Sequence, residues 1–201
     1  IDRDFQARNI RDQNPSIGKN LETFKLYHNS YRPNTVFAGT GGALNVITFI
    51  DGEWDHVAEL RDMSDAIRSI SMDLEGRIWV GTNLKGIGMF DFSNPGDTIV
   101  EKYGIDRGLT EVHTCIVQLI NGDLYSATPD GLFKYVKEGD QFVPDTLFGA
   151  AFAGGNGIEI YKVVPTRDGE FYLSIREPSG RDITNQTIRL IPEDNGHYTA
   201  I

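Results

Sequence analysis

The stretch IRSISMDLEGRIWVGTNLKGIGMF, residues 67–90, decides the fold, because it alternates short β-rich runs with tight turns. The runs 67–72 and 77–82 are rich in aliphatic and β-branched residues, and residues 73–76 form a polar turn between them. We expect Gly76 to adopt the positive φ that such a turn requires. Ile78, Trp79 and Val80 are apolar on both faces, so this strand should be covered on both sides.

The same unit recurs along the chain. With Gly81 of IWVGT as the anchor, the matching positions are Gly39, Ala127 and Ser174, so that successive anchors are separated by 42, 46 and 47 residues. A turn residue lies two positions before each run, at Asn34, Gly76, Gly122 and Gly169. A period of about 40–50 residues with four short strands each is typical of β-propeller blades. The sequence therefore predicts an all-β propeller of four-stranded antiparallel blades, closed or part of a larger ring, with blades at residues 21–60, 67–110, 111–152 and 158–201.

Residues 70–90 resemble the two-component regulator propeller repeat, with Asp73, Gly76, Trp79-Val80-Gly81-Thr82 and Gly86-Ile87 in place. One extra residue separates Thr82 from Gly86, the third blade matches partly through Gly122 and Gly131, and the first and fourth blades are eroded. The resemblance implies an extracytoplasmic or periplasmic sensor region of a bacterial hybrid histidine kinase. Many such regions respond to glycans, and the repeat carries no catalytic residue.

Composition narrows the classes of partner. The formal charge is −10 over 201 residues, which argues against nucleic acid and anionic membrane surfaces as partners. Cys115 is the only cysteine, so an internal disulfide is excluded, and its apolar neighbours predict a buried side chain. The sequence contains no run of 18 apolar residues, so it predicts no membrane-spanning helix. The chain begins at Ile1 and ends at Ile201 within an expected strand, which indicates an excerpt of a longer protein.

Three segments allow alternative interpretations. Residues 1–20 are polar and predict either an arm or, through residues 5–10, a strand that completes an unfinished blade. Residues 54–70 have apolar side chains near helical spacing, but the repeat favours a strand followed by a loop. Residues 176–185 form the longest insertion, which we expect to be a functional loop.

The sequence contains no recognisable catalytic constellation, metal site or cofactor loop. The four histidines lack ligand spacing, no calcium loop or Lys-Ser/Thr phosphate loop occurs, and no G-x-S-x-G elbow is present. We therefore expect no metal and no cofactor. Trp79 is expected to pack between blades, and we assign a structural role also to Gly76, Gly81, Gly122, Gly131 and Gly169.

Propellers usually bind ligands at one mouth, where the loop that leads into each blade meets the loop after its second strand. Arginine forks at such a mouth recognise carboxylates and sulfates, and aromatic rings stack on sugars. The residues that we expect in this position are Arg61, Asp62, Arg68, Asn83, Lys85, Arg107, His113, Asp130, Tyr161, Arg176 and Arg181.

These observations favour a non-catalytic module that senses a glycan or another small ligand in a two-component signalling protein. An alternative is a propeller glycoside hydrolase or lyase, for which Asp62, Asp130 and Glu177 are the candidate carboxylates. A further alternative is a structural propeller that docks a protein or forms a homodimer.

Overall fold

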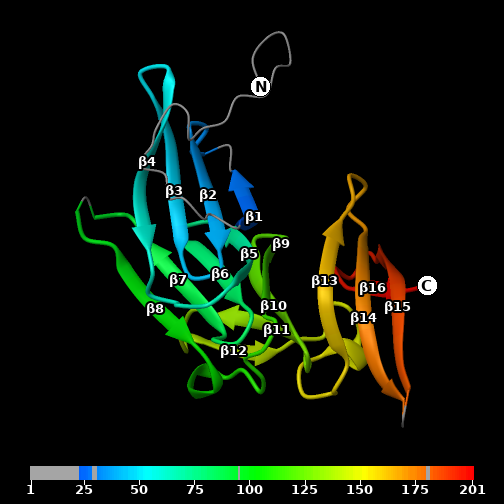
Figure 1. Ribbon diagram of the computed structural model, residues 1–201. Helices are drawn as coiled ribbons and strands as arrows, with labels where there is room; N and C mark the ends of the chain where they lie inside the picture. Colours follow the sequence, from blue (N-terminus) through cyan, green and yellow to red (C-terminus); the bar gives the residue numbers. More distant parts are fainter. Residues whose placement is uncertain (1–22, 29–30, 95, 180–181) are drawn as a thin grey trace. The chain divides into compact units, whose positions relative to one another are not determined.

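The computed structural model describes residues 23–28, 31–94, 96–179 and 182–201, and the predicted arm at residues 1–20 lies outside them. The described chain is nearly all β, with sixteen strands in four antiparallel sheets and two short 3₁₀ helices (Figure 1). Each sheet consists of four strands that are consecutive in the sequence. The predicted all-β fold built from four-stranded propeller blades is confirmed. The chain divides into two compact units, residues 1–67 and 68–201.

Blade 1 belongs to the first unit. Its strands, in order, are β1 (Thr23–His28), β2 (Thr35–Thr40), β3 (Leu44–Ile50) and β4 (Glu53–Leu60). Asp51 and Gly52 both have positive φ, 51° and 89°, as a two-residue Asp-Gly hairpin turn requires. The helical spacing after Trp54 does not produce a helix, because β4 pairs with β3 along its whole length and absorbs one extra residue in a bulge.

Blades 2, 3 and 4 contribute the remaining strands. Blade 2 contains β5 (Ile67–Met72), β6 (Ile78–Thr82), β7 (Ile87–Asp91) and β8 (Ile99–Tyr103); blade 3 contains β9 (Ile116–Ile120), β10 (Asp123–Thr128), β11 (Gly131–Val136) and β12 (Gln141–Pro144); blade 4 contains β13 (Glu159–Pro165), β14 (Phe171–Ser179), β15 (Asp182–Pro192) and β16 (Tyr198–Ala200). The helices η1 (Ile105–Arg107) and η2 (Ala150–Phe152) lie in the linkers that precede blades 3 and 4.

The anchor of the repeat has the same place in every sheet. Gly39, Gly81, Ala127 and Ser174 lie on the second strand, opposite residues of the third strand. Gly81 shows why the position is small, because a Cβ there would lie 2.1 Å from the carbonyl oxygen of Cys115, which immediately precedes β9. The second strand of blade 2 therefore approaches the backbone of blade 3 too closely for a side chain.

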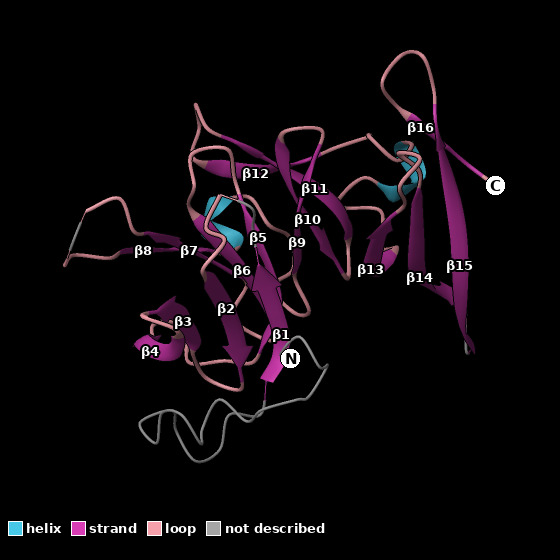
Figure 2. Cartoon of the chain, turned by 90° about the horizontal axis from the view of Figure 1, so that it is seen from above, coloured by secondary structure: helices cyan, strands magenta, loops and turns pink. Residues whose placement is uncertain are grey.

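The seam between blades 2 and 3 combines polar and apolar contacts. β5 and β9 run side by side (Figure 2), and the backbone amides of Val117 and Leu119 donate to the hydroxyls of Ser69 and Ser71 at 2.8 and 3.1 Å. Further out, the fully buried Trp79 ring lies 4.8 Å from the Tyr135 ring and 6.2 Å from the Phe142 ring. The two sheets are thus joined from the first strand outward.

Cys115 is completely buried in this seam, as expected. Burial raises the pKa of its thiol to about 12. The side chain therefore remains protonated at physiological pH and acts as a small apolar residue.

Candidate functional site

The most conspicuous polar residue of the repeat, Asp73, holds the turn that precedes β6. Its carboxylate accepts hydrogen bonds from the backbone amides of Glu75 and Arg77 at 3.1 and 2.9 Å, from Arg77 Nε at 2.6 Å and from Trp79 Nε1 at 2.6 Å. Gly76 completes this turn with a φ of 83°. Both carboxylate oxygens are engaged within the turn, so Asp73 builds the blade and has no oxygen to offer a ligand.

A threonine at the end of the second strand closes the next turn in three blades. The hydroxyls of Thr40, Thr82 and Thr128 donate to the carbonyl oxygens of Ala43, Gly86 and Gly131 at 3.0, 2.8 and 3.0 Å. Blade 4 has Ile175 at the corresponding place. There β14 and β15 continue to pair through Arg176↔Asn185 as far as Ser179↔Asp182. The prediction of a loop over residues 176–185 was therefore wrong, because most of this segment extends a β-hairpin.

In the first unit, two of the predicted mouth residues follow β4. Arg61 is 70% exposed in its side chain, and its Nη2 lies 2.6 Å from Glu59 Oε1. Asp62 is exposed. These side chains lie at the surface beyond the end of the strand.

In the second unit, the predicted residues Asn83, Lys85 and His113 lie on two adjoining loops. The Thr114 amide donates to the carbonyl oxygen of Asn83 at 2.8 Å, and the Gly86 amide donates to that of Val112 at 3.0 Å. Lys85 is exposed, and the His113 imidazole contacts the Glu111 carboxylate at 2.7 Å. The β6–β7 turn and the linker before β9 thus form one hydrogen-bonded rim. Arg68 is exposed on β5.

Asp130 joins further loops of this rim. One carboxylate oxygen accepts a hydrogen bond from the Thr110 hydroxyl, and the other accepts from the Gly157 amide at 2.8 Å. The Gly155 amide also donates to the Asp130 carbonyl oxygen at 2.8 Å. Asp130 therefore links the β10–β11 turn to both neighbouring linkers, and both of its carboxylate oxygens take part in these contacts.

Arg107 contacts a different group of side chains. Its guanidinium lies 4.7 Å from the Tyr103 ring and donates to Glu101 at 2.8 Å and to Asp140. Asp140 precedes β12 and also accepts hydrogen bonds from the Tyr103 and Tyr135 hydroxyls at 2.8 and 2.9 Å. This network joins the outer strands of blades 2 and 3, and the hydrogen bonds that the structure describes for Arg107 are made within it.

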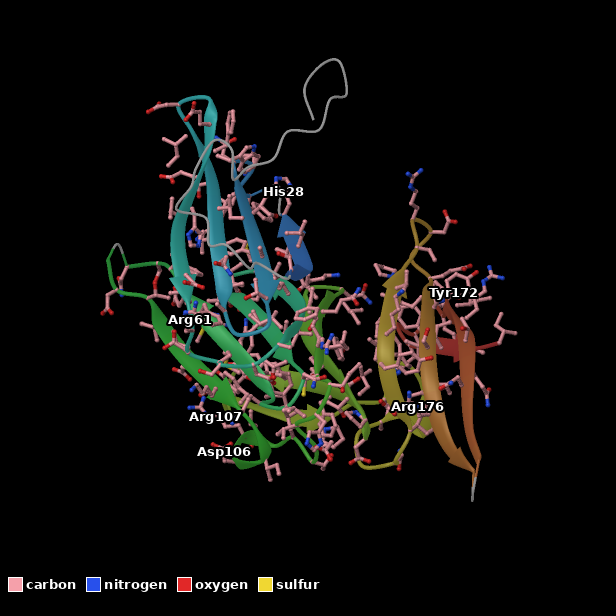
Figure 3. All side chains as sticks on the ribbon, viewed as in Figure 1. His28, Arg61, Asp106, Arg107, Tyr172 and Arg176 are labelled. Atoms are coloured by element: carbon pink, nitrogen blue, oxygen red, sulfur yellow. The ribbon has the colours of Figure 1, made fainter. Side chains whose placement is uncertain are left out.

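Tyr161 and Arg176, the predicted residues of blade 4, lie together. The Arg176 guanidinium is 5.7 Å from the Tyr161 ring centroid. Its Nη1 donates to Glu159 at 3.0 Å and its Nε donates to the side-chain oxygen of Asn185 at 3.3 Å. Arg176 and Tyr172 both come from β14 in Figure 3. Arg181 and the Glu177 side chain lie outside what the structure describes.

Sequence reasoning missed most of the surface on which Arg176 lies. Directly paired residues of an antiparallel sheet project from the same face, which gives the row Val164, Tyr172 and Arg189 and the row Lys162, Ser174 and Thr187. We call the surface formed by these two rows together with Arg176 the open face of blade 4. Tyr172 is 41% exposed, and Lys162, Val164, Thr187 and Arg189 are also exposed. The opposite face of this sheet carries the buried residues Ile160, Phe171, Leu173, Ile175 and Leu190.

Arg189 is held in position on the open face. Its Nε and Nη2 donate to the two carboxylate oxygens of Glu170 at 2.8 and 2.6 Å, which is the geometry of a forked pair. These hydrogen bonds keep the pKa of Glu170 below its ordinary value, so the carboxylate stays ionised. The aligned anchors could have predicted the open face, because Tyr172 corresponds to Trp79 and Tyr125, whereas Ser174, Thr187 and Arg189 replace Gly81, Ile87 and Met89.

A separate cleft of about 500 Å³ lies between blades 2 and 3, beside the turn of Asp73. The ion pair between Glu75 and Lys137 joins the two blades beside it at 2.9 Å, and Lys134 contacts Asp123 at 2.6 Å within blade 3. None of the residues predicted to contact a ligand lines this cleft. Several of the charged side chains that line the cleft are thus already engaged in ion pairs.

Across the residues that the structure describes, no group of three or more His, Cys, Asp or Glu side chains could hold a metal ion. The described part of the chain also contains no helix with the length and apolar character that crossing a membrane requires.

No protein-family model matches the sequence, and no curated protein matches it significantly. Solved structures do share its fold. The extracellular domain of a hybrid two-component system from Bacteroides thetaiotaomicron is 17% identical, with a TM-score of 0.54 over 83% of this chain and 24% of that chain. An auxiliary nutrient-binding protein from Bacteroides ovatus is 12% identical, with a TM-score of 0.57 over 90% of this chain and 42% of that chain.

An ancestral GH74 enzyme is also similar, at 14% identity and a TM-score of 0.53 over 89% of this chain and 25% of that chain. The chain thus spans less than half the length of each of these structures. At these identities the similarity concerns the fold alone, which sensors, binding proteins and an enzyme have in common.

Proposed function

We propose that this chain is part of an extracytoplasmic bacterial sensor propeller that binds a glycan or another small polar ligand without catalysis. The observation that carries the proposal is the open face of blade 4. In blades 2 and 3 the corresponding anchor residues are buried, whereas this face presents an exposed tyrosine among arginine, lysine and threonine side chains. The propeller fold, which an extracellular two-component domain and a nutrient-binding protein share, supports the class.

The chemistry of the open face suits an oligosaccharide with acidic groups. The Tyr172 ring offers an apolar surface for a sugar ring, and Arg176 and Arg189 offer planar donors for hydroxyl or carboxylate groups. Glu159 and Glu170 already orient the two guanidinium groups. A ligand would therefore meet donors whose conformational entropy is largely lost before binding.

The mouth residues supply a second part of the proposed contact surface. Lys85 and His113 stand on the hydrogen-bonded rim of blade 2 and its linker, where backbone contacts fix the loop conformation. Asp130 is assigned the role of holding the rim in this proposal, since both of its carboxylate oxygens accept hydrogen bonds from neighbouring loops. We therefore propose binding and not hydrolysis at this edge.

Calorimetric titration of the protein with neutral and acidic oligosaccharides tests the proposal. Tyr172→Ala and Arg176→Ala should each weaken association by about tenfold or more, which corresponds to about 1.4 kcal/mol. Arg61→Ala and Lys85→Ala test whether the predicted mouth residues of the first and the second unit contribute to association. Tyr31→Ala is the matched control, because Tyr31 is 83% exposed on blade 1.

Two outcomes would contradict the proposal. Tight binding that none of the four test variants weakens would remove the assigned surface. Release of shorter sugars during the titration, detected by chromatography, would establish the hydrolase or lyase alternative instead.

A further inference from the structure

The linker between blades 2 and 3 contains a histidine whose ring lies against a carboxylate of the same loop. One oxygen of that carboxylate, Glu111 Oε1, accepts hydrogen bonds from the backbone amides of Val112 and His113 at 2.7 and 3.2 Å. The same oxygen lies 2.7 Å from Nδ1 of the His113 imidazole. Glu111 therefore contacts both the backbone and the ring of His113.

Backbone hydrogen bonds fix this part of the linker on the rim. The amides of Thr114 and Gly86 donate to carbonyl oxygens of the loop that faces each of them, at 2.8 and 3.0 Å. These two hydrogen bonds flank His113 in the linker and Lys85 in the β6–β7 turn, so the two residues lie on facing loops. Thr114 also has a φ of 47°, which β-branched residues rarely adopt. Such a conformation persists only where surrounding contacts hold it, and it occurs most often at functional sites.

The contact with Glu111 determines which nitrogen of the neutral His113 ring carries the proton. A carboxylate oxygen offers only lone pairs, so a ring nitrogen 2.7 Å away is favourable only when it is protonated. The proton of the neutral ring is therefore on Nδ1, and Nε2 has a free lone pair. The side chain is 55% exposed, and no hydrogen bond that the structure describes involves Nε2. This nitrogen is thus available as a hydrogen-bond acceptor.

We infer that Glu111 is a positioning residue that fixes His113 as a hydrogen-bond acceptor, so that the rim takes a hydroxyl group of its ligand in preference to a carboxylate. A hydroxyl both donates and accepts, so it suits Nε2 of His113 together with the ammonium group of Lys85. A carboxylate would place its lone pairs against that of Nε2. The preference for a hydroxyl rests on the proposed function, whereas the position of the proton is a property of the protein without ligand.

Nitrogen NMR of the free protein, labelled with ¹⁵N at histidine, tests the position of the proton. Spectra over a pH series identify the range in which the His113 ring is neutral. In that range Nδ1 should have the chemical shift of a protonated nitrogen and Nε2 that of an unprotonated one. Glu111→Ala should give a mixture of the two ring forms. The resonances of the other three histidines are the control for an unchanged fold.

Glu111→Gln separates the charge of Glu111 from its effect on the proton. This variant loses the charge but keeps a carbonyl oxygen. The amides of Val112 and His113 should hold that oxygen, and not the side-chain NH₂ group, in the position of Oε1. The ring proton should therefore stay on Nδ1. A loss of the Nδ1–H form in Glu111→Gln as complete as in Glu111→Ala would contradict this role of the oxygen.

Calorimetric titration in the same pH range tests the preference for a hydroxyl. The two probes are a neutral oligosaccharide and its counterpart of equal length and linkage that contains uronic acid units. The ratio of neutral to acidic affinity should fall about fivefold in His113→Ala and in Glu111→Ala, because one hydrogen bond to the hydroxyl is lost or misdirected. Glu111→Gln should largely keep the ratio. Glu138→Ala removes a charge from the exposed β11–β12 turn and should leave the ratio unchanged.

Three results would overturn the inference. The first is a neutral wild-type ring that carries its proton on Nε2, even if a sugar binds. The second is an affinity ratio that His113→Ala and Glu111→Ala leave unchanged. The third is a ratio that falls equally in Glu111→Gln and Glu111→Ala, which would assign the effect to charge. Absence of binding to both probes would instead contradict the proposed function and the hydroxyl preference together, and the NMR result would then decide the role of Glu111 separately.

Discussion

Blades 2 and 4 use the same register of residues for opposite purposes. On blade 2, Trp79 and Gly81 of β6 lie beside Met89 and Ile87 of β7, and this face is buried against blade 3. On blade 4, the equivalent positions are Tyr172, Ser174, Arg189 and Thr187, and the face is exposed. The comparison teaches that the repeat specifies backbone geometry, whereas the residues between its turns vary from an apolar set on blade 2 to a polar set on blade 4.

The largest effect should come from the aromatic position. Trp79→Ala removes a ring that is fully buried, contacts four aromatic or cationic groups and donates to Asp73, so it should cost about 3–5 kcal/mol. Tyr172→Ala should cost less than about 1 kcal/mol, because its side chain is already 41% exposed. Urea unfolding of both variants measures the difference. Equal costs would mean that the two positions are not used differently.

The fold was accessible from the sequence because its determinants are local. The Asp51-Gly52 and Gly76 turns need positive φ, and β-branched runs between turns have few alternatives to strands. The helical spacing of apolar residues after Trp54 predicts a helix only when that segment is considered alone. The repeat corrected it, because a strand at that position pairs with β3.

The candidate site was accessible only in part. Tyr161 and Arg176 could be named because they lie next to a predicted turn or insertion. Lys162, Tyr172 and Arg189 lie inside ordinary strands, so no local turn or insertion marks them. Only the comparison of Tyr172 and Arg189 with the equivalent buried residues Trp79 and Met89 could have singled those two out. The hairpin of β14 and β15 was likewise missed, since strand length depends on cross-strand pairing and not on local sequence alone.

The anchor position should give the next largest effect. Gly81→Ala places a Cβ 2.1 Å from the Cys115 carbonyl oxygen, so blades 2 and 3 must separate, at a cost of about 1–3 kcal/mol. Ser174→Ala on the open face should change the free energy of unfolding by less than about 0.5 kcal/mol. Blade 3 already has Ala127 at this position, which is why alanine is the informative substitution. A neutral Gly81→Ala would show that the seam can widen freely.

The smallest effect concerns the carboxylates of the turns between third and fourth strands, Asp140 in blade 3 and Glu193 in blade 4. Partial burial of Asp140 acts to raise its pKa, but hydrogen bonds from Tyr103 and Tyr135 and the charge of Arg107 outweigh this, so its pKa lies below the ordinary value of 3.8. Ionised Asp140 therefore stabilises the seam above about pH 4, and this contribution is lost as the pH falls through the lowered pKa.

Between about pH 5 and pH 2, the free energy of unfolding of Asp140→Asn should accordingly fall less than that of the wild type. The difference between the two falls should be less than about 1 kcal/mol, because the Asp140 side chain is 48% exposed. Glu193 is the matched control. Its carboxylate accepts only from Thr199 and Asn195 of its own blade among the hydrogen bonds that the structure describes, and these hydrogen bonds lower its pKa. Since Glu193 is exposed, its contribution to the free energy of unfolding should vanish in high salt, whereas that of Asp140 should persist in part because Asp140 joins two sheets. Acid unfolding curves of Asp140→Asn and Glu193→Gln at low and high salt distinguish the two, and identical salt dependence would mean that the seam between blades 2 and 3 gains nothing from Asp140.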